Sequence, residues 1–279
     1  MPFYFYIIIG VIGFFLLLFL VYLFLLKTKR EKGLKEYKGA LFAHRGLHGE
    51  GRAENSMSAF LAAVEAGYGI ELDIRLSADG QVVVFHDDTL LRVCGIDKRV
   101  NELTAEELSR LSLSGTADGV PTFAEVLAAV DGKVPLLVEI KEDRGECGVT
   151  PIAAEMLKNY KGKFIVESFN PLSLKAYKKY DPSVICGVLS QSYWKEKKFR
   201  KGIYYMLGAL VTNIFCRPSF IAFNIEHKGN LALKIARFFF RTPTFAWTVR
   251  SDDDGKMALK SGFDGLIFEN YLPELPKGK

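Results

Sequence analysis

Hydrophobic residues fill one unbroken stretch at the start of the chain, before any charged residue appears. Every residue between Pro2 and Leu26 is uncharged, and most are Phe, Ile, Leu, Tyr or Val. A helix needs about 20 apolar residues to cross a bilayer, so this stretch is long enough. A cleaved signal peptide would begin with basic residues and end at a small-residue site. Because neither is present, the pattern predicts an uncleaved transmembrane anchor over residues 1–26.

The residues that follow this anchor are strongly basic. They are Lys27, Lys29, Arg30, Lys32, Lys35 and Lys38. Basic residues flank membrane helices on the cytoplasmic side. We therefore expect a single-pass protein of the cell membrane, with residues 27–39 as a basic linker and the rest of the chain in the cytoplasm.

From residue 40 to 279, short apolar runs alternate with stretches in which apolar residues recur at helical spacing. The runs cover 39–44, 69–75, 135–141, 163–168, 183–189, 219–224, 244–249 and 264–268. The helical stretches cover 56–66, 123–130, 151–160, 172–180, 231–240 and 252–261. Such alternation is typical of a parallel sheet. Eight units over about 240 residues favour the α/β class and a (β/α)₈ TIM barrel over an open sheet. No G-x-G-x-x-G loop follows the first run, which argues against a dinucleotide-binding sheet.

One further apolar run, 81–86, falls outside this alternation. The Asp79-Gly80 pair before it is a strong hairpin signal, so we expect an antiparallel excursion from the second strand. The charged stretch that follows, residues 87–119, includes a short helical pattern at 104–111 with Thr104 and Glu107 spaced as a capping box. We interpret this stretch as a small insertion on the barrel rim.

Three acidic residues lie at the carboxyl ends of predicted strands, where a barrel carries its chemistry. Glu71 and Asp73 are two positions apart and share a face of the second strand, and Glu139 ends the third barrel strand. Burying three carboxylates without compensation is implausible. A divalent cation would resolve this, and all-oxygen ligands favour Mg²⁺ or Ca²⁺ over zinc. Taken singly, each acid could instead be solvated, or Glu139 could pair with Lys141.

Two histidines and two cations occur at the same strand ends. His44 and His86 carry imidazoles that transfer protons near neutral pH. Arg45 and Lys141 carry fixed positive charge suited to a phosphate. The combination indicates chemistry on a phosphate group next to the acidic residues.

Composition narrows the function further. Lys and Arg number 37 against 32 Asp and Glu, and part of the excess lies in the linker. This mild charge argues against nucleic acid as a partner. The four cysteines lie far apart without a CxxC pair, which argues against a zinc cluster or a disulfide framework. His48 and His227 lack acidic neighbours in the sequence, so we expect them at the surface.

A series of motifs occurs in order along residues 40–272. They are His44-Arg45-Gly46, Glu54-Asn55-Ser56, Ala59-Phe60, Glu71-Leu72-Asp73, Asp79-Gly80, 83–87, Thr89-Leu90, Arg92, Leu103-Thr104, Glu107-Leu108, Pro121-Thr122, 138–141, Ser168-Phe169, Trp247-Thr248-Val249 and 263–267. Together they resemble the glycerophosphodiester phosphodiesterase family. Ser56 stands where Thr is usual and should preserve a helix cap. Phe268-Glu269-Asn270 stands where the family often has Thr-Asp.

This resemblance implies a TIM barrel with a rim insertion that hydrolyses glycerophosphodiesters to sn-glycerol 3-phosphate and an alcohol with a divalent cation. Some members act on lysophospholipids as lysophospholipase D enzymes. The resemblance assigns acid–base catalysis to His44 and His86, metal ligation to Glu71, Asp73 and Glu139, phosphate contacts to Arg45 and Lys141, and a place in the substrate pocket to Trp247. In the family the glycerol hydroxyl can itself attack phosphorus, giving a cyclic phosphate that water then opens.

Two alternatives of other kinds stay open from the sequence. A phosphatidylinositol phospholipase C-like or sphingomyelinase D-like enzyme would also use a barrel with paired histidines, but residues 138–141 and Trp247 favour the first family. A membrane-tethered, non-catalytic binding barrel would have lost a metal acid or a histidine, and none is lost.

Residues 195–216 have no counterpart among these motifs. Lys195, Lys197, Lys198, Arg200 and Lys201 precede an uncharged run, 203–216, that is too short to cross a bilayer. Because the segment follows the fifth barrel strand, we expect it on the loop face, as an interfacial element that contacts lipid. The alternative is a buried barrel helix.

Overall fold

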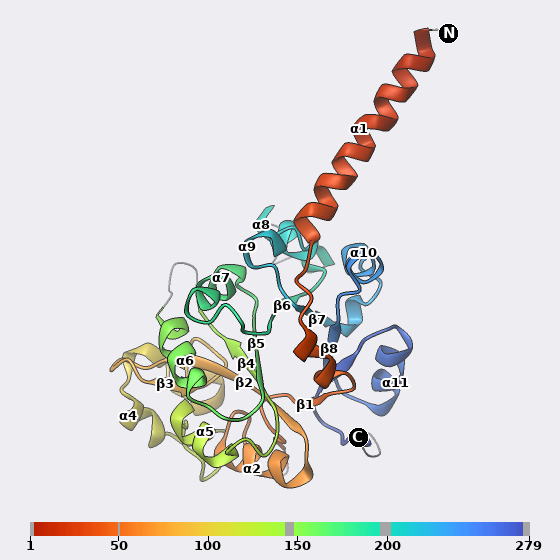
Figure 1. Ribbon diagram of the computed structural model, residues 1–279. Coiled ribbons are helices and arrows are strands. Elements are labelled where there is room, and N and C mark those ends of the chain that lie inside the picture. The colour runs from red at the N-terminus through yellow and green to blue at the C-terminus, as the bar shows by residue number, and fades with distance from the viewer. Residues whose placement is uncertain (1–2, 50, 143–147, 196–201, 276–279) are drawn as a thin grey trace.

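Eight parallel strands form a closed barrel in the computed structural model, which describes residues 3–49, 51–142, 148–195 and 202–275 (Figure 1). The strands are β1 (Leu41–Ala43), β2 (Gly69–Leu76), β4 (Leu136–Ile140), β5 (Phe164–Ser168), β6 (Cys186–Ser190), β7 (Phe220–Asn224), β8 (Thr244–Val249) and β9 (Gly265–Phe268). The barrel closes because β1 pairs in parallel with both β2 and β9. The predicted TIM barrel is thus confirmed.

Helices surround the barrel at nearly the predicted positions. They are α2 (Met57–Ala66), α5 (Phe123–Val130), α6 (Val149–Lys158), α7 (Pro171–Tyr180), α10 (Leu231–Phe240) and α11 (Asp252–Lys260). Local sequence sets their ends. Ser56 caps α2 as expected, because its Oγ accepts a hydrogen bond from the backbone N of Ala59 at 3.2 Å. Gly67 ends the same helix with a left-handed φ of 76°.

Inside the barrel, inward-facing side chains form two layers. The first is apolar, and the second, two residues further along the strands, is mostly polar. The apolar layer includes Phe42, Leu137, Ile165, Phe245 and Ile267. Two residues after each of these, at the carboxyl ends of the strands, come His44, Glu139, Glu167, Trp247 and Glu269. Because side chains alternate along a strand, residues two apart point the same way. One end of the barrel is therefore apolar and the other carries its chemistry.

The predicted hairpin is present as β3 (Val82–Val84), which pairs antiparallel with β2 and places Val84 opposite Ile74. Three short helices follow: α3 (Leu91–Cys94), η2 (Val100–Glu102) and α4 (Ala105–Ser109). They bury a small core of their own with Phe85 and Leu108 at its centre. Thr104 and Glu107 form the expected capping box of α4.

Part of the basic segment after residue 26 folds onto the apolar end of the barrel. It forms the short 3₁₀ helix η1 (Lys32–Tyr37), which buries Leu34 and Tyr37 against the apolar layer. The Tyr37 ring stacks on Phe42 with a centroid distance of 6.3 Å. The backbone N of Gly39 donates to the carbonyl of Asp264 at 2.6 Å. These residues close the amino-terminal end of the barrel and are not a free spacer.

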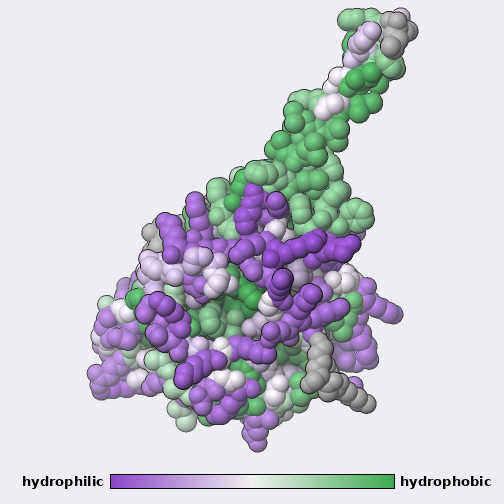
Figure 2. Space-filling view, in the orientation of Figure 1, coloured by the Kyte–Doolittle hydropathy of each residue, from purple (hydrophilic) through white to green (hydrophobic). Residues whose placement is uncertain are grey.

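Helix α1 (Phe3–Leu26) projects away from the barrel and exposes apolar side chains on all its faces (Figures 1 and 2). It is long and apolar enough to span a bilayer, the one such helix among the described residues.

Two segments differ from the prediction. Strand β6 begins at Cys186, later than expected, because Asp181 accepts hydrogen bonds from the backbone N and Oγ of Ser183 and holds a turn there. The run 203–216 forms two short helices instead of one, α8 (Gly202–Gly208) and α9 (Asn213–Cys216), separated by Leu210 at a φ of 58°. Of the basic residues before it, Lys197, Lys198, Arg200 and Lys201 lie outside the described residues, whereas Lys195 ends the 3₁₀ turn η3 (Tyr193–Lys195).

Candidate active site

The three predicted metal ligands meet at the carboxyl ends of β2 and β4. Strand register places Asp73 beside Glu139, and Glu71 points the same way as Asp73. One carboxylate oxygen from each lies within 4.8 Å of those of the other two. All three side chains are buried, with exposures of 1–5% for the residues. The sequence prediction that these acids share one place is correct.

Two cations and one amide contact these acids. Lys141 Nζ lies 2.7 Å from Glu139 Oε1 and 3.1 Å from Asp73 Oδ1. Arg45 Nε lies 3.4 Å from the other Asp73 oxygen. Asn55 donates from Nδ2 to the same oxygen at 2.8 Å, from a left-handed backbone position with φ 54°. Asp73 is therefore the most heavily partnered of the three carboxylates.

A tight turn after β1 brings backbone to the acidic cluster. Arg45 has a φ of 56°, and its backbone N donates to Glu71 Oε2 at 2.8 Å. Gly46 follows with a φ of 80°, and a Cβ at this position would lie 2.9 Å from Ala59. Both the conformation and the close approach require glycine. This explains the glycine of the His-Arg-Gly motif.

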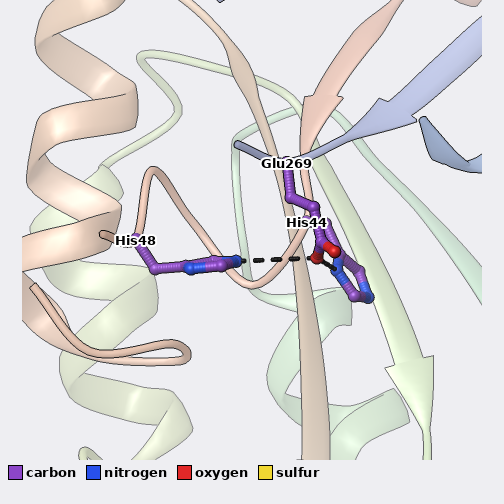
Figure 3. Close-up of side chains that lie close together, drawn as sticks. All are labelled: His44, His48 and Glu269. Atoms are coloured by element: carbon purple, nitrogen blue, oxygen red, sulfur yellow. Dashed lines mark hydrogen bonds and ion pairs between the residues drawn. The ribbon is translucent and has the colours of Figure 1, made fainter. Parts of the chain in front are cut away.

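His44 is held by a carboxylate from the last strand (Figure 3). Its Nδ1 lies 2.5 Å from Glu269 Oε2, while His48 Nε2 lies 3.7 Å from the same oxygen. Arg250 donates from Nε to the other Glu269 oxygen at 2.7 Å. A carboxylate can only accept, so Nδ1 of neutral His44 carries the proton and Nε2 is left as the basic nitrogen. Burial lowers the pKa of His44, and the hydrogen bond to Glu269 opposes this shift.

His86 is held in the same way, by the adjacent Asp87. Its Nδ1 lies 2.6 Å from Asp87 Oδ1. Arg92 donates to Asp87 at 2.6 Å and to both oxygens of Glu54 at 2.6 and 2.9 Å. Glu54 in turn accepts from Arg45 Nη1 at 2.8 Å. An ionic chain thus connects the second histidine to the arginine beside the acids.

Electrostatics keeps His86 neutral and Asp87 ionised. Burial lowers the pKa of His86 to about 4, although the charge of Asp73 opposes this. Burial raises the pKa of Asp87, but hydrogen bonds from Arg92 and His86 outweigh it and lower that pKa to about 2. At neutral pH the pair therefore consists of a carboxylate and an imidazole with a basic Nε2.

Trp247 forms an aromatic wall beside this site. Its ring makes an edge-to-face contact with Phe169 at a centroid distance of 5.5 Å. Lys141 Nζ lies 5.7 Å from the centre of the Phe169 ring. Trp247, the predicted pocket residue, therefore contacts a ring that in turn lies close to the Lys141 ammonium group.

The nearby cations only partly offset the burial and mutual repulsion of the three acids. Burial raises the pKa of Glu71 well above its usual range, and the charges of Asp73 and Glu139 add to this. Burial also raises the pKa of Glu139 to about 7, against the pull of Lys141. For Asp73 the cations outweigh burial, with Lys141 contributing most, and hold its pKa well below normal. Two of three clustered carboxylates thus need more positive charge to ionise.

This cluster fits a hard divalent cation. Asp73 Oδ1 and Glu139 Oε1 are buried, and the single ammonium group of Lys141 lies at ion-pair distance from both. Converging carboxylate oxygens are the donor set that Mg²⁺ and Ca²⁺ prefer. Glu71, Asp73 and Glu139 could therefore hold such an ion.

Comparisons with known proteins show the family of the chain. Residues 44–272 match the sequence model of the glycerophosphoryl diester phosphodiesterase family. The chain belongs to this family. A curated glycerophosphodiester phosphodiesterase from Caldanaerobacter subterraneus subsp. tengcongensis is 28% identical over 84% of this chain and 95% of its own.

Solved structures of the glycerophosphodiester phosphodiesterase family show the same barrel. The Thermotoga maritima enzyme is 28% identical, with a TM-score of 0.65 over 82% of this chain and 94% of its own. A phosphodiesterase from Oleispira antarctica, solved with its product sn-glycerol-3-phosphate, has a TM-score of 0.69 at 20% identity, over 84% of this chain and 94% of its own. The predicted family and the enzyme class, a phosphoric diester hydrolase, are confirmed, and the alternative classes are not favoured.

Two acids of this site, the buried Glu167 and the half-buried Glu269, were not among the predicted site residues. Glu167 on β5 lies beside Glu139 in the strand register, and its Oε2 has no hydrogen-bond partner among the described residues. Burial raises its pKa well above normal, and Glu71 adds to this. Glu269 holds His44. Strand alternation could have found both, because they follow the buried Ile165 and Ile267 by two positions.

The expectation that His48 and His227 are surface residues is wrong. His48 is half-buried and contacts Glu269. His227, in the 3₁₀ turn η5 (Ile225–His227), is 7% exposed, and its Nδ1 accepts a hydrogen bond from the backbone N of Ser192 at 3.2 Å. Their partners are distant in the sequence, so the local absence of acids was misleading.

Proposed function

We propose that the chain hydrolyses glycerophosphodiesters at this site, with one Mg²⁺ or Ca²⁺ ion, to a glycerol phosphate and an alcohol. One observation carries the proposal: three buried carboxylates, two carboxylate-held histidines, an arginine and a lysine converge on one barrel end. The family supports a divalent cation in general terms and a phosphodiester substrate.

In this mechanism Arg45 and Lys141 bind the non-bridging oxygens of the phosphodiester. Their fixed charges oppose the negative charge that builds in the transition state. Bound at Glu71, Asp73 and Glu139, the cation would add Lewis-acid stabilisation of the same oxygens. The chain of ion pairs through Glu54 keeps the Arg45 guanidinium in place during the reaction.

His44 and His86 act as a proton-transferring pair. Each has Nδ1 fixed by a carboxylate, Glu269 or Asp87, so each presents Nε2 for catalysis. One imidazole accepts the proton of the attacking hydroxyl, from water or from the substrate's glycerol, and the other, once protonated, donates to the leaving alkoxide. In this scheme Glu269 and Asp87 are positioning residues.

We further propose that α1 anchors the chain in the cell membrane, with residues 40–279 as the catalytic domain on the cytoplasmic side. The apolar length of α1 and the cations that follow it support this. Helices α8 and α9, with exposed Tyr205, Met206 and Phe215, lie next to the base of α1 (Figure 1). A lysophospholipid is accordingly a second substrate class, because its diester lies at the membrane surface.

A substrate panel tests the activity. Full-length enzyme is assayed with glycerophosphocholine and a lysophosphatidylcholine, each with Mg²⁺, Ca²⁺ or EDTA. His44→Asn and His86→Asn are compared with the matched control His227→Asn, which changes a histidine outside the site. We expect a glycerol phosphate product only with a divalent ion, and loss in the first two variants alone. Choline phosphate as the product would instead indicate a phospholipase C-like reaction.

A reporter fusion tests the anchor separately. A reporter active only in the cytoplasm, fused after residue 279, should be active, and the chain should resist extraction from membranes by alkaline carbonate. A reporter at the same place that is active only outside the cytoplasm contradicts the proposed orientation.

A further inference from the structure

The last turns of α1 are fastened to the barrel by polar contacts. Tyr22 Oη donates to the carbonyl of Ala209 at 3.1 Å, and Asn213 Nδ2 donates to the carbonyl of Leu26 at 3.3 Å. Arg217 Nη1 donates to the carbonyl of Phe24 at 2.6 Å, and its guanidinium lies 4.7 Å from the Phe24 ring centre. The helix therefore leaves the barrel in a defined direction.

A second contact reaches further along α1. The Phe19 ring packs edge-to-face against Phe239, at the C-terminal turn of α10, with a centroid distance of 5.7 Å. Phe19 precedes Leu26 by seven residues, which corresponds to about 10 Å along a helix axis. Phe239 therefore contacts α1 at a residue about 10 Å back from the point where the apolar stretch of α1 ends.

This position is below the membrane surface wherever α1 sits in the bilayer. A helix of 24 residues is about 36 Å long, and the hydrocarbon core is about 30 Å thick. Even if the whole excess of about 6 Å lay on the barrel side, Phe19 would remain within the hydrocarbon. The Phe239 ring lies within 5.7 Å of the Phe19 ring, and so close to the same depth.

Phe239 and its neighbour in the chain are exposed and apolar, as expected of residues that contact lipid. Phe238 is 80% exposed and Phe239 45% exposed, and both would be costly to leave in water. The hydrophobic surface of α1 continues onto the barrel around its base (Figure 2). Cations follow the apolar segments of both helices: Lys29 and Arg30 come after α1, and Arg241 comes after α10. That order matches lipid tails and then anionic head groups.

We propose that Phe238 and Phe239 insert into the same leaflet as α1 and form a second membrane attachment point. This rests on the proposed anchoring role of α1. With two points of attachment, the barrel cannot tilt freely about the base of α1. The amino-terminal ends of β7 and β8, which follow α9 and α10 in the chain, then lie on the side of the barrel nearest the bilayer. The lipid partner is a bilayer with anionic head groups.

Cysteine labelling tests this in the full chain. Phe238→Cys is compared with Leu61→Cys, which replaces a 47% exposed leucine on α2, a helix on the side of the barrel away from α1 (Figure 1). Both are made with Cys94 and Cys147 changed to serine, and the chain is reconstituted into nanodiscs of phosphatidylcholine and phosphatidylglycerol. The probe is a charged maleimide, which does not enter hydrocarbon.

We expect Phe238→Cys to react at least about tenfold more slowly than Leu61→Cys, the factor given by ~1.4 kcal/mol of insertion free energy. Both should react equally after denaturation in dodecyl sulfate. Equal rates in nanodiscs, with the chain still co-eluting with the discs, would overturn the second attachment point alone. A chain that fails to co-elute would overturn the anchor and this proposal together, while activity on soluble glycerophosphocholine tests the enzyme independently.

Discussion

The two ends of the barrel are built from the same strands but differ in what their interiors contain. At the amino-terminal end, Phe42, Phe220 and Phe245 pack together, and η1 covers them with Leu34 and Tyr37. At the carboxyl end, one strand period further on, the interior is filled with charged and aromatic groups. The first end gains stability from buried apolar area. The second end loses stability, because the neighbouring carboxylates Asp73 and Glu139 repel the charge of Glu71 and raise its pKa.

This contrast shows how a barrel separates folding from catalysis. An apolar layer holds the strands together, so the polar layer can tolerate repulsion that would otherwise disrupt a core. Substitutions at the two ends should therefore differ in kind. Those at the carboxyl end should change turnover with little loss of fold, and those at the amino-terminal end should do the reverse.

The largest effect on turnover should come from the acids. Glu71→Gln and Asp73→Asn should each lower kcat/KM by about 10³-fold or more, since a bound cation supplies several kcal/mol of transition-state stabilisation. Circular dichroism should show an intact fold. The control Glu155→Gln, on the exposed face of α6, should leave kcat/KM unchanged. Substantial activity in either site variant would remove that residue from the ligand set.

The histidines should come next. His44→Asn and His86→Asn should each lower kcat by about 10²–10⁴-fold, the usual contribution of general acid–base catalysis. The double variant should be little worse than either single one, because the two act as a unit. Burial lowers both pKa values below 6.5, so protonation should inactivate the base only below that value, and the histidine that acts as the acid should lose its proton as the pH rises through its own lowered pKa. A loss of activity that already begins above pH 6.5 as the pH is lowered would contradict the lowered pKa of the catalytic base.

Lys141→Met should have a smaller effect, about 10–100-fold on kcat/KM, because in the proposed mechanism Arg45 would remain to bind the phosphate. Removal of Lys141 also takes away the cation that opposes the raised pKa of Glu139. Steady-state kinetics at saturating metal measures the loss. Unchanged kinetics would reduce Lys141 to a structural ion-pair partner of Glu139.

Glu269→Gln tests a positioning role and should cost about tenfold in kcat, by analogy with other partners that orient a functional histidine. Glutamine can present its NH₂ to His44 Nδ1 and so favour the wrong tautomer. The pH profile should shift with kcat, whereas KM should stay close to normal. A variant with a normal pH profile would show that Glu269 only fills space.

Turnover should change least at the amino-terminal end of the barrel. Leu34→Ala should lower the free energy of unfolding by about 2–5 kcal/mol, as for other buried leucines. The kcat of the folded protein should match the wild type, since Leu34 lies an entire layer away from the acids. Denaturant unfolding and kinetics on the same sample measure both. A large loss of kcat without a loss of stability would contradict the proposal that the amino-terminal end stabilises the fold and takes no part in turnover.

Much of this arrangement was predictable from the sequence, for physical reasons. Parallel strands bring their carboxyl ends to one place, so Glu71, Asp73 and Glu139 could be grouped from alternation alone. The partners of the histidines could only partly be foreseen. Asp87 is adjacent to His86 in the chain, whereas Glu269 lies on the strand that closes the barrel beside β1. Glu167 was overlooked because one acid after Ile165 and Val166 resembles a solvated strand end.

Packing between residues that are distant in the chain was harder to predict from the sequence. Nothing local in residues 32–37 indicates that Leu34 and Tyr37 cover the barrel, since the segment is basic and short. The contact between Phe19 and Phe239 joins residues separated by most of the chain. Such contacts depend on where the closed barrel places its helix ends, which hydrophobic periodicity does not encode.

Metal removal tests the central claim most directly, that the carboxyl end is a metal-dependent phosphodiesterase centre. The wild-type enzyme is stripped with EDTA, dialysed, and assayed on glycerophosphocholine by ³¹P NMR before and after addition of Mg²⁺ or Ca²⁺. Activity should be absent from the stripped enzyme and return with one of the two ions, with glycerol phosphate as the phosphorus-containing product. Full activity in the stripped enzyme would contradict the assignment of Glu71, Asp73 and Glu139 as metal ligands.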